Sequence, residues 1–367
     1  ITTALALQAD WLGHLKADAG VLEVDEASLK GVAAEVPLQW LVVTNLFRDQ
    51  LDRYGELDTT ARLVAQGFDD LGAGAWLNAD DPLVANLAAK TDKAFFYGID
   101  AVEYAFAPPT LEELALPFPQ ETTPCPRLAT DLAYDTRFYA HLGHYRCPAC
   151  GYRRPRPSVL ATIRQAGPQG ALLDVRTQQG DRDLAFTLRS QLPGVYNQYN
   201  LVAAVAMALK RDVPPEAMQR ALDGYAGVFG RAERRTVQNK PLTVLLIKNP
   251  AGATEVLRLV AGDPNARLVV AINDDYADGR DVSWLWDAAF ELIVPGQTET
   301  VVVSGRRAED MAVRLKYAGL DEKRLLVEPD LKLAVRAGVA NLREGQTLYV
   351  LPTYTALLEL RNLWKQV

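Results

Sequence analysis

The chain has 367 residues, which is long enough for two domains that each have a hydrophobic core. Its net charge of −7 argues against a general nucleic-acid-binding protein. No apolar run approaches the roughly 18 residues of a membrane-spanning helix. The three cysteines would leave one unpaired in a disulfide framework. We therefore expect a cytoplasmic globular protein.

The first part of the chain mixes strand and helix patterns. Apolar or alternating runs predict strands at 19–27, 38–44, 76–78 and 94–97, and helical spacing predicts a helix at 59–71. Residues 105–125 are rich in proline, glutamate and threonine, which marks a boundary or an insertion. Alternation within 158–190 predicts antiparallel strands, and a helix is expected at 197–210.

From about residue 237, strands alternate regularly with helical segments. The expected strands are at 242–247, 268–272, 300–304, 325–327 and 348–351. Strands separated by helices indicate βαβ units and a mainly parallel sheet. The predicted fold class is therefore α/β, with a central domain over 1–236 and a second α/β domain over 237–367.

Polar residues follow the first two expected strands. Thr44 opens a polar and charged stretch that runs to Glu56, directly after a buried strand. The carboxyl edge of a parallel sheet is where ligands bind. Glu23, Asp25 and Glu26 end the preceding strand and predict a Mg²⁺ site, although a strand that simply leaves for solvent would also become acidic.

Four segments in chain order resemble signatures of the Mur ligase superfamily, namely 44–56, 77–82, 192–200 and 229–233. The resemblance implies an ATP-binding domain with a parallel sheet, in which Glu23 binds Mg²⁺ and Asn200 meets the adenine. It also implies that Arg231 reaches the ATP phosphates. Asn45 and Asn78, in the first two segments, are further candidates for binding ATP.

The phosphate-binding loop of that superfamily, Gly-x-x-Gly-Lys-Thr, does not occur in the chain. We expect that the authentic N-terminus, with this loop, precedes Ile1. The alternative is an ATPase that has lost its nucleotide site.

Two positions separate the chain from the members of the superfamily that add amino acids. Gln50 stands where those ligases have a histidine that helps to hold a second metal. Leu63, Val64 and Ala65 offer no lysine where those ligases often carry a carbamylated one. The resemblance therefore implies a different acceptor.

A cysteine-bearing insertion is expected over about 121–158. Cys147 and Cys150 form a Cys-x-x-Cys-Gly half-site of the kind found in zinc ribbons, and Cys125 begins a second half in which Leu128 occupies the place of a cysteine. We expect Zn²⁺ here, with His144, His141 or water as the fourth ligand. A metal-free ribbon held by its own apolar contacts is the alternative.

The ribbon and the second domain resemble the MurT family, the synthetase subunits of lipid II isoglutaminyl synthase. The segments that carry this resemblance are 246–252, 272–287 and 351–360. Lys248 stands where ordinary Mur ligases have histidine, and it is a further candidate for the ATP site. The resemblance implies that the chain phosphorylates the D-glutamate α-carboxylate of lipid II, and that ammonia then forms D-isoglutamine.

The resemblance also implies a GatD-type glutaminase as partner, because that family delivers ammonia from a separate subunit. The three cysteines here all belong to the ribbon, so no Cys–His pair for releasing ammonia is visible. MurT proteins supply an acid that orients the partner's histidine, and Asp278 and Asp281 are the candidates. On spacing alone, Asp281 is also a plausible helix cap.

Two surface features are expected from the residues themselves. Trp284 and Trp286 cannot both lie on one helical stripe, so one is free to face a partner. The ribbon carries a dense basic cluster for which we expect a position facing the bilayer that holds the substrate, or a solvated surface: Arg146, Arg153, Arg154 and Arg156.

Two other functions fit parts of the sequence. One is a ligase of the same superfamily that adds an amino acid. The other is a non-catalytic scaffold that has lost its nucleotide site.

Overall fold

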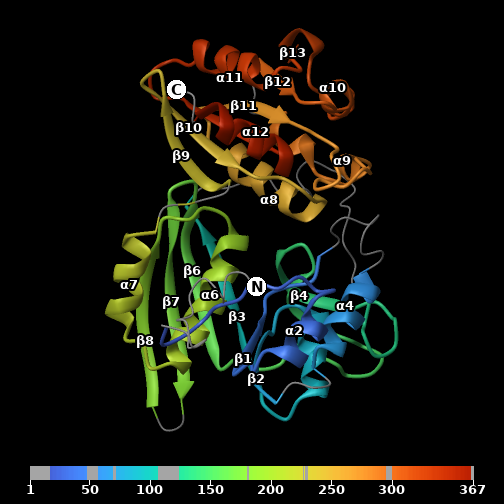
Figure 1. The fold of residues 1–367 in the computed structure, drawn as a ribbon, viewed down its shortest axis with the longest axis vertical. Helices are drawn as coiled ribbons and strands as arrows, with labels where there is room; N and C mark the ends of the chain where they lie inside the picture. The colour runs from blue at the N-terminus through green and yellow to red at the C-terminus, as the bar shows by residue number, and fades with distance from the viewer. Residues whose placement is uncertain are drawn as a thin grey trace, which may run out of the picture.

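The computed structural model describes residues 17–47, 57–68, 72–105, 124–179, 182–225, 227, 230–294 and 300–364. The chain forms two α/β domains that lie one above the other along the long axis of the molecule (Figure 1). Each domain is built on its own six-stranded sheet. The predicted α/β class is confirmed.

The sheet of the first domain has the order β1-β2-β3-β6-β7-β8. Its first four strands are parallel, and β6, β7 and β8 are antiparallel neighbours, as the alternation in 158–190 predicts. The strands are β1 (Trp40–Val43), β2 (Gly74–Asn78), β3 (Ala94–Tyr104), β6 (Val159–Gly167), β7 (Gly170–Gln179) and β8 (Arg182–Ser190).

Helices cover both faces of this sheet. α6 (Val195–Lys210) packs on the face that carries Trp76, Tyr97 and Ile99, in one apolar cluster. Leu77 and Ala75 point to the opposite face, where they pack with apolar residues of four helical segments. Those segments are α2 (Leu29–Glu35), α4 (Leu57–Gln66), α5 (Pro82–Asn86) and η1 (Leu87–Lys90). α7 (Pro215–Asp223) lies beside β8.

The predicted strand at 19–27 is wrong. The segment runs irregularly up to a turn at 26–28, and no ladder joins it to the sheet. Val24 is half-buried against the cluster below α2, whereas Val21 is 98 % exposed. Alternation of apolar and acidic residues specifies which side of an extended segment faces the core, but a strand also needs hydrogen-bonding partners.

The insertion between β3 and β6 folds as a ribbon. Its described part contains a hairpin of β4 (Ala133–Tyr139) and β5 (Leu142–Arg146), flanked by the cysteine-bearing turns at 125–130 and 147–152. A strap, residues 153–158, then leads into β6. The ribbon therefore begins and ends at neighbouring strands of the parent sheet.

The second sheet has the order β13-β12-β11-β14-β10-β9. Its strands are β9 (Arg231–Val237), β10 (Lys240–Leu245), β11 (Ala266–Ala271), β12 (Val301–Ser304), β13 (Leu325–Val327) and β14 (Thr347–Pro352). All of them are parallel except β9, which pairs antiparallel with β10. β9 carries four charged residues in seven and lies at the edge, so its sequence does not show the apolar run of a buried strand. It extends the second sheet to residues before 237.

Helical segments again cover both faces. One face carries α8 (Pro250–Ala261), α9 (Trp284–Asp287), η2 (Phe290–Ile293) and α10 (Ala308–Tyr317). The other face carries α11 (Leu331–Ala340) and α12 (Tyr354–Trp364), and the short η3 (Glu322–Arg324) precedes β13. No helix within the described ranges is long and apolar enough to cross a membrane.

The two domains meet where α6 and α8 begin. Ala251 of α8 belongs to the apolar cluster of the first domain, and Tyr196 of α6 packs against the clusters of both domains. Deeper in α8, buried Glu255 pairs with Arg258 at 3.1 Å, and Arg258 interacts with Tyr104 of β3. Burial raises the pKa of Glu255, and Arg258 opposes that rise.

Candidate functional site

Hydrogen bonds of the Asn78 side chain connect the carboxyl ends of β1 and β2. Its side-chain amide donates to the Thr44 carbonyl at 2.9 Å, and its oxygen accepts the Asp80 amide at 3.0 Å. The Tyr97 hydroxyl donates to the Val43 carbonyl at 3.0 Å and reaches the Thr44 carbonyl at 3.3 Å. Asn78 is fully buried, so these bonds fix the backbone at Thr44. In this arrangement Asn78 positions the sheet edge.

Asp80 is a buried carboxylate with three donors. Arg154 of the strap donates from Nε at 2.5 Å, the Ile99 amide donates at 2.7 Å, and the Tyr199 hydroxyl of α6 donates at 2.9 Å. Burial raises the pKa of Asp80, while Arg154 and the Ile99 amide oppose that rise. Asp80 therefore joins β3, α6 and the ribbon at one point. Arg154 faces this carboxylate instead of a bilayer, which corrects its expected place in the basic cluster.

Asp81 joins three further segments. It caps α5 by accepting the Leu83 and Val84 amides at 2.9 and 3.2 Å. Its other oxygen accepts the Leu46 amide at 2.9 Å and lies 3.2 Å from His141 Nε2. Both Asp81 and His141 are fully buried. The ribbon is thus seated on the end of β2 by charged and polar contacts.

The other expected ATP residues lie around the same sheet edge and the domain boundary. Asn45 is half-buried after β1, and Glu23 is exposed on the irregular segment before α2. Asn200 is exposed on α6, one helical turn after Tyr196, which places it beside the domain boundary. Lys248 is exposed just before α8, whose cap is Asn249.

Two expected residues cannot be placed. The backbone of Arg231 begins β9, but its side chain lies outside the described residues. Gln50 falls in 48–56, also outside them. The structure thus joins the segments that carry Asn45 and Asn78, through the Thr44 carbonyl, and leaves the roles of the other residues as predictions.

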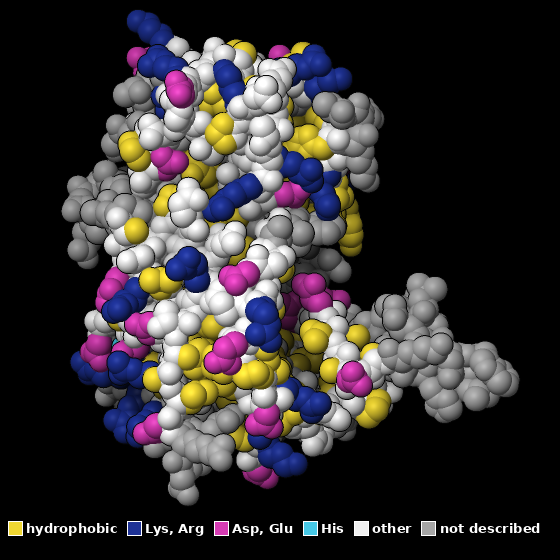
Figure 2. Space-filling view, turned by 90° about the vertical axis from the view of Figure 1, so that its left-hand side faces the viewer, with side chains coloured by type: hydrophobic (Ala, Val, Ile, Leu, Met, Phe, Trp, Pro, Cys, Tyr) yellow, Lys and Arg dark blue, Asp and Glu magenta, His cyan; other side chains and the backbone are white. Residues whose placement is uncertain are grey.

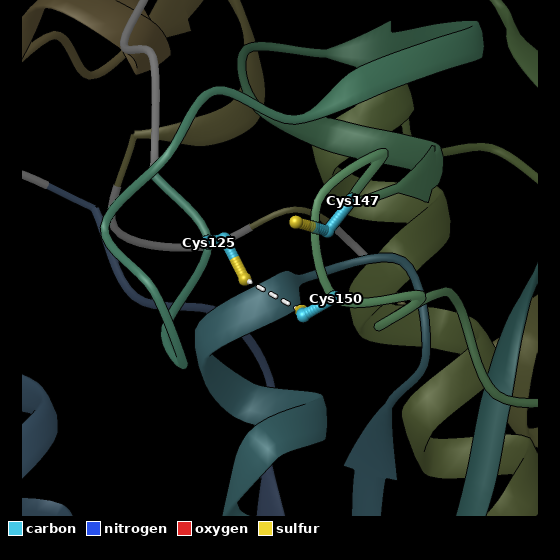
Figure 3. A group of neighbouring side chains, drawn as sticks. All are labelled: Cys125, Cys147 and Cys150. Carbon is cyan, nitrogen blue, oxygen red and sulfur yellow. Dashed lines mark hydrogen bonds between the residues drawn. The ribbon is translucent and has the colours of Figure 1, made fainter.

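The three cysteines converge in the ribbon (Figure 3). Their sulfur atoms all lie within 4.8 Å of one another, and the Sγ atoms of Cys125 and Cys150 are 3.6 Å apart. The Thr130 hydroxyl lies 3.4 Å from Cys147 Sγ, and this hydrogen bond lowers the pKa of the Cys147 thiol to about 6. A thiol that ionises readily is suited to binding a metal.

The two cysteine-bearing turns have the same backbone. In the first turn, the Cys125 amide donates to the Thr130 carbonyl at 2.7 Å, and the Ala129 amide donates to the Cys125 carbonyl at 2.8 Å. In the second turn, the Cys147 amide donates to the Tyr152 carbonyl at 2.6 Å, and the Gly151 amide donates to the Cys147 carbonyl at 3.0 Å.

The fifth residue has a positive φ in both turns, 54° at Ala129 and 72° at Gly151. Leu128 therefore occupies the position that Cys150 has in the other turn, and it is half exposed. The chain offers three of the four thiolates of a closed zinc site.

Neither expected histidine completes the cysteine cluster. His141 Nε2 faces Asp81, and His144 Nε2 lies 3.0 Å from the Ile99 carbonyl. Within the described residues, the group that can hold a metal contains the three cysteines alone. This corrects the expectation of a histidine as the fourth ligand and leaves water.

The loop after β11 separates the two aspartates that the sequence could not distinguish. Asp278 is buried, and it accepts the Asp275 amide at 3.1 Å and the Thr355 amide at 2.8 Å. It also accepts a short hydrogen bond from the Thr355 hydroxyl. Asp278 thereby ties its loop to the start of α12.

Asp281 is exposed, and it accepts a local hydrogen bond from the Ser283 amide at 2.8 Å. That amide lowers the pKa of Asp281, so the carboxylate is ionised at neutral pH. Its remaining acceptor sites face solvent. Of the two aspartates, Asp281 is the one available to another molecule.

Exposed aromatic side chains lie near this loop. Trp286 is 53 % exposed and stacks edge-on against Tyr317 with ring centroids 5.6 Å apart. Tyr276 is 76 % exposed in the loop itself. Trp284, by contrast, packs against the core of the second domain. As predicted, one of the two tryptophans is exposed while the other packs inward, and its role in binding a partner stays a prediction.

No sequence pattern indicated the contacts that hold the ribbon and the loop in place. Arg154, His141, Tyr199 and Thr355 each meet an aspartate far away in the sequence. Only a fold that brings those segments together could have identified them.

Comparisons with known proteins agree over most of the chain. The profile of the family described as MurT ligase C-terminal matches residues 246–357. The MurT subunit of lipid II isoglutaminyl synthase (glutamine-hydrolyzing) from Staphylococcus aureus strain COL is 31 % identical over 358 residues, 97 % of this chain and 76 % of that protein. The corresponding subunit from Streptococcus pneumoniae is 32 % identical over 94 % of this chain and 73 % of that protein.

Solved structures give the same fold. A pseudomurein peptide ligase type C from Methanothermus fervidus has a TM-score of 0.67 at 20 % identity, and it covers 92 % of this chain. MurF from Acinetobacter baumannii has a TM-score of 0.61 at 16 % identity and the same coverage. This chain spans 65 % and 62 % of their respective lengths. The fold is that of the Mur ligases, and the chain belongs to the MurT family.

Proposed function

We propose that the chain is the ATP-dependent synthetase subunit of a lipid II-amidating ligase. The observation that carries the proposal is the similarity to MurT subunits over 97 % of the chain, together with the family match in the second domain. Lipid II is anchored in the membrane, so the protein works at the inner surface of the plasma membrane through its substrate.

The proposed reaction has two steps. A carboxylate oxygen of the D-glutamate α-carboxyl attacks the γ-phosphorus of ATP, and ADP leaves. The nitrogen of ammonia then attacks the acyl carbon, phosphate leaves, and the product is D-isoglutamine. Protecting the acyl phosphate from water is the main demand on the protein, and the two stacked domains suit it because the expected ATP residues lie at the sheet edge and the domain boundary.

The chain's own residues fit part of an ATP and Mg²⁺ site. Mg²⁺, when bound, neutralises charge on the phosphates. We assign Glu23 as its candidate ligand and Asn45, Asn200, Arg231 and Lys248 as candidates for contacts with ATP. Asn78, through the Thr44 carbonyl, holds the edge of the sheet on which Asn45 lies.

Ammonia must come from elsewhere in this scheme. All three cysteines belong to the ribbon, so the chain has no cysteine free to act as the nucleophile of a glutaminase. A GatD-type glutaminase subunit would supply it. We assign Asp281 as the acid that orients the partner's histidine, because Asp278 is buried and saturated while Asp281 is exposed and ionised.

We further propose that the exposed aromatic side chains Tyr276, Trp286 and Tyr317 form part of the surface that receives this partner. Tryptophan and tyrosine are common anchors at interfaces. Tyr276 lies on the same loop as Asp281, and Trp286 and Tyr317 lie on helices that follow this loop.

The test is amidation by the full-length protein copurified with its glutaminase partner. Lipid II, ATP and glutamine should give an amidated product by mass spectrometry, with one ADP for each amide. A requirement for a free amino acid in place of glutamine would show a different ligase of the superfamily. If no ADP were released with any acceptor, the chain would be a non-catalytic scaffold. A sample without glutamine is the control.

We also propose that the ribbon holds Zn²⁺ on Cys125, Cys147 and Cys150, with water as the fourth ligand. The measurement is metal content by mass spectrometry of the purified protein. One zinc per chain is expected, and Cys147→Ser should lose it. Leu128→Cys should slow zinc release to a chelator, because it completes a four-thiolate site, and Leu128→Ser is its matched control. A folded wild-type protein free of metal would refute the zinc assignment.

A further inference from the structure

An open groove with a volume of about 1110 Å³ lies beside the ribbon. Its walls are α5 and η1 on one side and the second cysteine turn with the strap on the other, and its floor is formed by β6, β7 and β8. Among the residues that the structure describes, five arginines line it together with one acid, Asp183. We call it the arginine groove, after the four of them that do not bind Asp80: Arg127, Arg153, Arg156 and Arg176.

These four arginines are exposed residues. None of them pairs with a carboxylate within the part of the chain that the structure describes. The fifth arginine, Arg154, is neutralised by Asp80, so Asp183 is the acid that opposes the four. The protein as a whole has a net charge of −7, and a concentration of positive charge here is therefore a local feature. Such a concentration of positive charge favours an anionic ligand.

The arginines are held on ordered backbone. The strap contains Pro155 and Pro157, and its two ends are tied by bonds from the Arg154 amide to the Tyr145 carbonyl and from the Ser158 amide to the Phe96 carbonyl. The guanidinium of Arg127 stacks over the Tyr152 ring at 4.6 Å. Pre-ordered donors lose less conformational entropy when a ligand binds.

The groove also has an apolar lining. In the ladders that form its floor, Arg176 lies directly between Leu160 of β6 and Ala185 of β8. Phe96, Ala85 and Ala88 continue this surface, and Leu184 is 39 % exposed at its margin. A ligand that fills the groove would combine negative charge with an apolar part.

The groove is separate from the expected ATP site. Tyr97 and Val159 point to the face of the sheet that α6 covers, and α6 carries Asn200. Their neighbours Phe96 and Leu160 line the groove, on the opposite face.

In the view of Figure 2, Lys and Arg side chains gather low on one side of the first domain, with acidic side chains among them.

We propose that the arginine groove binds a phosphate or diphosphate group that is attached to an apolar chain. Guanidinium groups recognise phosphate oxygens by paired hydrogen bonds, and several of them together favour a doubly charged or repeated phosphate. A lipid headgroup and a soluble diphosphate share this chemistry. The inference does not depend on the proposed ligation, because it concerns binding alone.

The experiment measures binding of the full chain to two probes. One is cosedimentation with phosphatidylcholine vesicles, with and without phosphatidylglycerol. The other is calorimetric titration with inorganic pyrophosphate. The Arg153→Gln/Arg156→Gln variant should bind less tightly, by about fivefold for each arginine removed. Arg220→Gln/Arg336→Gln removes the same charge from exposed positions outside the groove and should bind like the wild type.

Each outcome decides the proposal. Binding only to vesicles that contain phosphatidylglycerol identifies the source as a lipid, and binding of pyrophosphate alone identifies a soluble phosphate. Loss of either in the groove variant supports the phosphate assignment. No binding of either probe, or equal loss in both double variants, would overturn it. Arg127→Gln/Arg176→Gln repeats the test on other elements, and unfolding midpoints confirm that each variant is folded.

Discussion

The turn at Asp80–Asp81 and the loop at Asp278–Asp281 both follow a buried parallel strand, and each carries two aspartates. In the turn both carboxylates are fully buried, and their oxygens are engaged by groups from β3, α6 and the ribbon. In the loop, Asp278 is buried in the same way, while Asp281 faces solvent. Two aspartates three residues apart therefore have different burial and different hydrogen-bond partners.

Burial and hydrogen bonding separate an acid that positions neighbouring segments from an acid that can act on another molecule. A carboxylate whose acceptor sites are all occupied holds segments together, and removing it leaves its donors unsatisfied. A carboxylate with free acceptor sites and a low pKa can receive a donor from a partner. Free energies of unfolding should follow the first property, and partner-dependent activity should follow the second.

The largest effect on stability is expected at Asp80. Asp80→Ala leaves Arg154 without its counter-ion in a mostly buried position, and such a change costs about 3–5 kcal/mol. Urea unfolding measures this loss. Asp80→Asn is the matched control, because it keeps a hydrogen-bond acceptor for the Ile99 amide and should cost less. Equal, small losses in both variants would show that the ion pair does not anchor the ribbon.

A smaller loss is expected at Asp278. Asp278→Ala removes the acceptor for the Thr355 hydroxyl and for two partly buried amides, and we expect a loss of about 1–3 kcal/mol. Thr355→Val should reproduce part of this loss, since it deletes the hydroxyl donor alone. If Asp278→Ala unfolded at the wild-type urea concentration, its role as a tie between the loop and α12 would be wrong.

The smallest effect on stability is expected at Trp286, together with a clear effect on assembly. Trp286→Ala removes an exposed ring that touches Tyr317 and Arg314, and it should cost about 1 kcal/mol or less. Its affinity for the glutaminase subunit should fall by tenfold or more, as at a typical interface anchor. Val327→Ala, at an exposed position on β13, is the control. Unchanged affinity would remove this surface from the interface.

The fold was predictable where burial dictates the sequence. The inner strands of the second sheet, such as β11 and β14, read as apolar runs because both of their faces are covered. The edge strand β9 was missed because four of its seven residues are charged, and 19–27 was overpredicted because its pattern does not supply a pairing partner. The local pattern of apolar and polar residues indicates which residues are buried. Which strands pair with one another depends on the whole sheet.

The candidate site was predictable in its residue types and less so in its geometry. The Cys-x-x-Cys-Gly motif predicted the ribbon, and the sulfur atoms of the three cysteines lie close together in the structure. The choice between Asp278 and Asp281 depended on Thr355, 77 residues further along the chain, and Asp80 meets Arg154 across 74 residues. Contacts over such separations exist only once the fold has formed.

Changing the nitrogen source tests the proposal that this chain amidates with ammonia made by a partner, and that Asp281 helps to activate that partner. The complex carrying Asp281→Asn should lose glutamine-driven amidation of lipid II by a hundredfold or more, by analogy with other orienting acids. It should keep the wild-type rate with ammonium chloride, and Asp287→Asn should be normal with both. Full activity of Asp281→Asn with glutamine, or loss of activity with both nitrogen sources, would show that Asp281 does not serve the partner's glutaminase reaction.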